Sequence, residues 1–76
     1  MPRAFVMVNV KVGTDREVLR QLESLEHVVK VYDVYGVYDL VAEIEADTME
    51  ELRTTMNSKI RRLDKVQSTH TMIVVE

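Results

Sequence analysis

The chain of 76 residues contains no cysteine, one proline and two glycines. Without cysteine, thiol catalysis, a disulfide framework and a cysteine-ligated metal site are excluded. So few glycines and prolines leave little room for linkers or disordered segments. No apolar run is long enough to span a bilayer, and Met1-Pro2-Arg3 leads straight into a strand pattern rather than a signal peptide. We therefore expect one domain over residues 1–76, in the cytoplasm and without a membrane partner.

The charge balance limits the partners of the chain. Ten Lys and Arg residues against 13 Asp and Glu residues give a formal net charge of −3. This charge argues against a dedicated nucleic-acid-binding protein. A chain this small, without a disulfide, has a limited core of its own. Oligomerisation is a common remedy for a small core, so we expect a homo-oligomer.

Hydrophobic periodicity predicts six elements in the order βαββαβ. The predicted strands are Ala4–Val12, Val28–Val37, Asp39–Ala46 and Val66–Val75. A helix is predicted after each of two capping boxes, Thr14 with Glu17 and Thr48 with Glu51. Because the boxes occupy matching points of the two halves, they favour an α+β, ferredoxin-like split βαβ repeat. Such a domain is a four-stranded antiparallel sheet with both helices on one face.

Apolar residues fall on both sides of the predicted strands. The first strand carries Phe5 and Met7 opposite its row of valines, and the second strand places Val31 opposite Val28. In a solitary two-layer domain, the sheet face away from the helices should be polar. A contiguous apolar patch indicates an interaction surface. We favour self-association over the alternative, an apolar surface partly covered by the chain ends.

No residue pattern indicates catalysis. His27 and His70 do not form an HxxxH or HxH pair, so no metal site is predicted. His27 is interpreted as a solvated turn residue, and His70 as either sheet packing or a ligand contact. The acidic stretch that includes Glu50 and Glu51 is interpreted as a solvated face and a helix start. Neither a Ser/His/Asp arrangement nor a nucleotide-binding loop is present, so we expect no enzyme activity, no catalytic residue and no cofactor.

Two short segments carry a ligand-binding prediction. A glycine lets backbone amides approach a carboxylate, an acid suits an ammonium group, and threonine hydroxyls donate or accept hydrogen bonds. Such a set suits a zwitterion such as an amino acid. The residues alone leave open that Gly36 only forms a bulge and that Asp39 only caps the turn. The predicted ligand-binding residues are Gly36, Val37, Tyr38 and Asp39 at the second turn, and Thr69 and Thr71 on one face of the last strand.

The pattern YGVYDLVAEIEA, a following helix and then VQSTHTMIVVE resembles the ligand-binding half of the leucine-responsive regulator/AsnC (Lrp/AsnC) family. This half is called the RAM domain, for regulation of amino-acid metabolism. The resemblance covers nearly the whole chain and rests on Gly-x-Tyr-Asp at residues 36–39 and on Val66, Thr69 and Thr71. It implies dimers whose sheets face each other and assembly of dimers into rings, often of four. It also implies amino-acid effectors bound between dimers near this turn.

The sequence departs from the family at two points. Full-length members begin with a helix-turn-helix DNA-binding domain, whereas this chain begins at its first strand. We therefore expect a stand-alone RAM protein that binds no specific DNA by itself and acts through full-length Lrp/AsnC regulators. The family often has Pro-Gly before the last strand, where this chain has Asp64-Lys65, and this difference alters a loop.

Other functions with the same element order stay open. An ACT-type amino-acid-binding module would bind its effector near Gly13, although the Gly-x-Tyr-Asp turn argues against it. A small dimeric α+β-barrel oxygenase or isomerase would need a buried acid–base group in a deep pocket, for which only His70 and the tyrosines are available. An RNA-binding sheet is disfavoured because Glu43 and Glu45 occupy the third strand in place of aromatic and basic residues.

Overall fold

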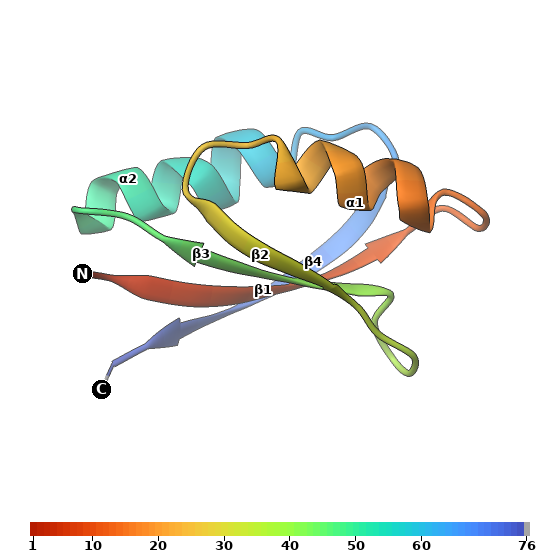
Figure 1. Cartoon of the computed structure of the whole chain (residues 1–76), viewed down its shortest axis with the longest axis horizontal. Helices are drawn as coiled ribbons and strands as arrows, with labels where there is room; N and C mark the ends of the chain where they lie inside the picture. The colour runs from red at the N-terminus through yellow and green to blue at the C-terminus, as the bar shows by residue number, and fades with distance from the viewer. Residues whose placement is uncertain (76) are drawn as a thin grey trace.

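The computed structural model of the chain describes residues 1–75. Its elements are β1 (Arg3–Val10), α1 (Asp15–Glu23), β2 (Val28–Asp33), β3 (Leu40–Glu45), α2 (Met49–Thr54) with its π-helical continuation η1 (Thr55–Ile60), and β4 (Val66–Val74). The strands form one antiparallel sheet in the order β2-β3-β1-β4, and the helices cover one face of it (Figure 1). The predicted ferredoxin-like fold is confirmed. No helix within residues 1–75 is long and apolar enough to cross a membrane.

The core lies between the sheet and the helices. In β1 and β3 every second residue is buried, as expected for strands that have one face under a helical layer. Full burial of one aliphatic side chain of this size contributes about 1.5–3 kcal/mol. Because all core residues face the helices, the core leaves the opposite face of the sheet uncovered. The largest fully buried apolar side chains are Leu22, Leu40, Ile44, Leu52, Ile60, Val6, Val8 and Val18.

β2 breaks the predicted alternation. Its pairing register with β3 shifts between Val28 and Lys30, as at a β-bulge. Val28 pairs with the core residue Ile44, and Val31 pairs with the core residue Ala42. Both valines therefore face the helices, and the prediction that they point to opposite sides is wrong. The inserted residue restores Val31 to the core, and strict alternation cannot predict such an insertion.

The observed strands are shorter than alternation predicts. β1 ends at Val10 and leaves Val12 fully exposed. β2 ends at Asp33 rather than Val37. β-branched residues continue into both turns, but no neighbouring strand is present there to pair with them. The third and fourth strands also lose their predicted end residues, and span Leu40–Glu45 and Val66–Val74.

The two predicted capping boxes have different outcomes. The box at Thr48 is confirmed: Glu51 N donates to Thr48 Oγ1 at 3.1 Å, and Thr48 N donates to Glu51 Oε1 at 3.3 Å. The box at Thr14 is wrong. Thr14 instead closes a turn, because its N and Oγ1 both donate to Lys11 O, at 3.0 and 2.6 Å. Gly13, at the third position of this turn, has a φ of +82°, the positive value that a type II turn requires.

Glu17, the expected partner of Thr14, makes a different contact. Lys65 Nζ donates a hydrogen bond to Glu17 Oε2 at 2.5 Å, and this bond raises the pKa of Lys65 above its usual value. Lys11 N also donates to Lys65 O at 3.0 Å. The residue that precedes β4 is therefore fixed both to α1 and to the end of β1.

The difference between the two threonines can be measured. We expect Thr48→Ala to lower the free energy of unfolding by about 1 kcal/mol, because Glu51 N loses its cap. Thr14→Ala should lower it by only about 0.5 kcal/mol, because the lost hydroxyl bond is exposed and the backbone bond of the turn remains. Urea denaturation followed by circular dichroism measures both values. A loss for Thr14→Ala equal to or above that for Thr48→Ala would contradict the assigned caps.

Candidate functional site

Asp39 bonds to three backbone groups in two segments, the end of β1 and the residue after β2. Its N donates to Val8 O at 3.0 Å, and its carbonyl oxygen accepts from Val34 N at 3.1 Å. Its carboxylate Oδ2 accepts from Val10 N at 2.9 Å. Since β3 begins only at Leu40, opposite Val8, the carboxylate supplies Val10 with the hydrogen bond that a longer β3 would have supplied. The Asp39 side chain therefore extends the sheet by one hydrogen bond beyond the end of β3.

The loop of residues 34–39 replaces a tight hairpin. Gly36 has a φ of +153°, which residues with a Cβ rarely adopt. A Cβ added at this position would meet no atom within 4 Å, so the backbone conformation alone requires glycine. Tyr35 and Val37 are exposed, and the loop projects beyond the end of the sheet (Figure 1). The predicted ligand-binding turn is thus an open loop held at its base by Asp39.

Tyr38 ties this loop to β4. Its hydroxyl lies 2.6 Å from Nδ1 of His70, and the two rings pack in a T-shaped arrangement with centroids 5.5 Å apart. His70 pairs with Met7 in the sheet register, so it lies on the face away from the helices. The contact crosses β1 and assigns His70 a partner that the sequence analysis left open.

Thr69 and Thr71 lie on the other face of β4. Thr69 pairs with Val8 and Thr71 pairs with Val6, and both valines are buried under the helices. Residues directly opposite each other in an antiparallel pair share a face. The two threonines therefore share the helix side of β4, whereas His70 between them lies on the opposite face.

The predicted ligand-binding residues do not converge on one point within the chain. Asp39 is one residue beyond the Val8–Leu40 pair, whereas Thr71 is opposite Val6. Strand geometry makes this offset about 10 Å along β1, with about 10 Å more across two strand spacings. The Cα atoms of Asp39 and Thr71 in one chain are therefore roughly 14 Å apart, and the two side chains do not adjoin.

The sheet face away from the helices is here called the outer face. Tyr32 and Met72 on it are 40% and 53% exposed. The Arg3 guanidinium lies 5.9 Å from the centroid of the Phe5 ring, and Lys30 Nζ lies 5.0 Å from that of Tyr32. The predicted apolar residues of the first strand do occupy this face. By register, the apolar members of the outer face are Phe5, Met7, Tyr32, Val41, Met72 and Val74.

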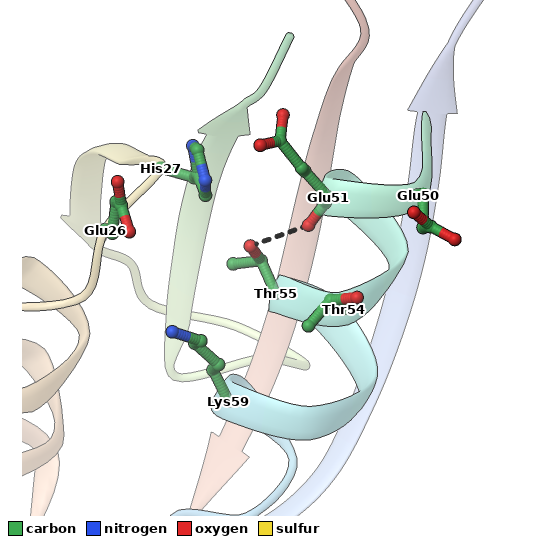
Figure 2. Close-up of a pocket in the computed structure, with 7 residues that line it drawn as sticks. All are labelled: Glu26, His27, Glu50, Glu51, Thr54, Thr55 and Lys59. Atoms are coloured by element: carbon green, nitrogen blue, oxygen red, sulfur yellow. Dashed lines mark hydrogen bonds between the residues drawn. The ribbon is translucent and has the colours of Figure 1, made fainter. Parts of the chain in front are cut away.

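A cavity of about 270 Å³ lies elsewhere, between the α1–β2 loop and the α2–η1 helix (Figure 2). Its lining includes Glu26 and His27, at the opposite end of β2 from Gly36. His27, predicted to be a solvated turn residue, lines this cavity. No local pattern signals it, since its walls come from segments far apart in the chain. Within residues 1–75, no three His, Asp or Glu side chains are placed to hold a metal ion.

The structural role of Asp39 can be tested by its effect on stability. We expect Asp39→Ala to lower the free energy of unfolding by about 1.5–3 kcal/mol, because Val10 N loses a charged acceptor. Asp39→Asn keeps an acceptor oxygen and should cost less than about 1 kcal/mol. Asp33→Ala, at the exposed end of β2, is the matched control and should change stability by about 0.5 kcal/mol or less. Equal losses in Asp33→Ala and Asp39→Ala in chemical denaturation would refute this role.

Comparison with known proteins gives consistent matches over the chain. A family model described as the Lrp/AsnC ligand-binding domain matches residues 3–76. The HTH-type transcriptional regulator FL11 of Pyrococcus horikoshii is 38% identical over 73 residues, which cover 96% of this chain and 48% of FL11. The chain thus spans about half the length of the curated relatives it matches.

Two solved structures are similar over nearly all of the chain. FFRP-DM1 is 37% identical with a TM-score of 0.94, and the match covers 99% of this chain and 100% of that chain. AsnC of E. coli is 28% identical with a TM-score of 0.90, and the match covers 99% of this chain and 51% of AsnC.

Proposed function

The chain belongs to the Lrp/AsnC family, through the ligand-binding domain of that family, and we propose that residues 1–76 form an oligomerising module that binds an amino-acid effector. Its curated relatives are transcriptional regulators, which supports a regulatory rather than a catalytic role. The observation that carries the proposal is the uncovered apolar outer face of the sheet, together with predicted binding residues that do not adjoin in one chain.

The outer face supports self-association. Met7 lies at the centre of this face on β1, with Val41 opposite it on β3 and His70 opposite it on β4. The helices cover only the other face (Figure 1), so within residues 1–75 these apolar side chains are only partly removed from water. A second copy that presents the same face would bury both apolar surfaces at once. The charged residues Arg3, Lys30 and Glu43 also lie on this face, where Glu43 is opposite Phe5 and forms an ion pair with Arg3.

The Asp39 loop supports binding of an ammonium group. Asp39 is held by three backbone contacts, so its carboxylate is already oriented before any ligand arrives. Oδ2 is used by Val10 N, whereas Oδ1 has no hydrogen-bond partner among residues 1–75. Oδ1 is therefore free to accept a charge-assisted bond from a ligand ammonium. In an assembly, Thr69 and Thr71 of a neighbouring copy would supply hydroxyls for the ligand carboxylate.

The regulatory output requires a DNA-binding partner in this proposal. The net charge of −3 does not favour binding to the phosphate backbone of DNA. The curated relatives are about twice the length of this chain, and FL11 is an HTH-type regulator. Mixed assembly with a full-length Lrp/AsnC regulator would connect an effector bound to this module to a DNA-binding domain.

The assembly can be measured by light scattering. We expect a dimer or a multiple of dimers at micromolar concentration. Met7→Lys should shift the protein to the monomer, because association would bury a charge in an apolar contact. Val12→Lys is the matched control: Val12 is fully exposed in the β1–α1 turn, and its replacement should leave the mass unchanged. A well-folded monomeric wild type at this concentration would refute self-association.

The effector site can be measured by calorimetric titration with a panel of amino acids. Asp39→Asn should weaken binding of the effector by roughly ten- to a hundredfold, because it removes a partly desolvated charge-assisted bond. Thr71→Val removes one neutral hydrogen bond and should weaken binding by about fivefold. Equal affinity in wild type and Asp39→Asn would contradict the ammonium role of Asp39. Failure of wild type to bind any member of the panel would contradict the effector function itself.

A further inference from the structure

His70 lies beside Met7 on the outer face of the sheet. The two residues are opposite each other in the register of β4 and β1, and the His70 side chain is exposed in the single chain. The function proposed above places a second copy of the chain against this face. In such an assembly, the imidazole of His70 would pass from water into the contact between the two sheets.

Tyr38, in the loop between β2 and β3, holds the His70 ring in place. Its hydroxyl lies 2.6 Å from Nδ1 of His70, and the two rings pack edge to face. A phenol hydroxyl can donate to Nδ1 of a neutral imidazole, and its oxygen can accept from the Nδ1–H of an imidazolium. Tyr38 therefore positions the ring without selecting its charge. The acid of the same loop, Asp39, bonds through Oδ2 to Val10 N.

The neighbours of His70 on β1 and β4 carry no charge on the outer face. One of them, Asn9, donates through Nδ2 to Ser68 Oγ at 3.2 Å, so these two polar side chains bond to each other. An imidazolium at position 70 would have no acid beside it on either strand. By register, the neighbours are Ser68 and Met72 on β4 and Phe5, Met7 and Asn9 on β1.

The charged groups of the outer face lie farther from His70 and are matched in sign. Its acids, Glu43 and Glu45, are on β3, which β1 separates from β4. Glu45 is opposite Arg3 and Glu43 is opposite Lys30. Glu43 also forms an ion pair with Arg3. Each acid thus has a basic residue beside it already, so neither is left unmatched to offset a proton on the His70 ring.

We propose that His70 makes the assembly of this chain sensitive to pH, a role that rests on the self-association proposed above. A histidine changes its charge between about pH 8 and about pH 5. Burial of a charge without an opposite charge is costly, so the contact between two copies binds fewer protons than the separated chains do. Association therefore weakens as the pH falls and recovers as it rises. A symmetric contact contains two copies of His70, and both contribute.

Sedimentation velocity over a concentration series measures the dissociation constant of the assembly at about pH 8 and at about pH 5.5, where most carboxylates are still ionised. For wild type the constant should be roughly tenfold higher, or more, at the lower pH. His70→Gln cannot take up a proton and should associate equally at both pH values. His27→Gln, the matched control in the α1–β2 turn, should keep the wild-type response. His70→Lys carries a permanent charge and should associate weakly even at the higher pH.

The results at the two pH values separate the role of His70 from self-association itself. A wild type that is monomeric at both pH values overturns both proposals. A wild type that assembles equally well at both, or better at the lower pH because an acid of the second copy meets the imidazolium, overturns the pH response alone. A wild-type pH response in His70→Gln also overturns it. Circular dichroism at both pH values checks that each variant is folded, so that dissociation is not confused with unfolding.

Discussion

The hydrogen bond from Val10 N to the Asp39 carboxylate connects the last residue of β1 to the residue before β3 at one end of the sheet. With this bond in place, β1 can leave the sheet at Val10 and enter the type II turn that leads to α1. The carbonyl oxygen of the same residue holds Val34 and closes the base of the β2–β3 loop. Asp39 therefore holds the end of β1 through its side chain and the base of the β2–β3 loop through its backbone.

This constraint shows that Asp39 has a structural role at the turn, one of the two alternatives that the sequence left open. A turn cap and a ligand contact were alternatives there, but a carboxylate has two oxygens. One oxygen of Asp39 holds β1, and the other has no partner among residues 1–75. A fixed acid at the base of a projecting loop suits recognition of a cation, because little side-chain entropy remains to be lost on binding. The structural role of Asp39 thus supports the proposed binding role rather than competing with it.

The sequence predicted the fold correctly where one hydrophobic or capping pattern determines the local structure. It failed where a bulge or a turn changes that structure. The alternation in β1 and β3 gave the correct core face because neither alternating run is interrupted. It failed in β2, where a bulge returns Val31 to the core. The same Thr-x-x-Glu spacing formed a cap at Thr48 but not at Thr14, whose hydroxyl is committed to the turn that Gly13 permits. The cavity near His27 had no sequence signal, because its lining residues come from two segments far apart in the chain.

The ends of the sheet also explain why association should use its face rather than its edges. β2 and β4 are the edge strands, and each carries an irregular register with its neighbour. Bulges and charges on an edge strand oppose its pairing with another sheet. β2 combines its bulge with Lys30 and Asp33 in a run of only six residues. On the outer face Met7 and Val41 lie side by side, and Glu43 follows Val41 on the same face of β3. These features favour a face-to-face contact for the proposed self-association.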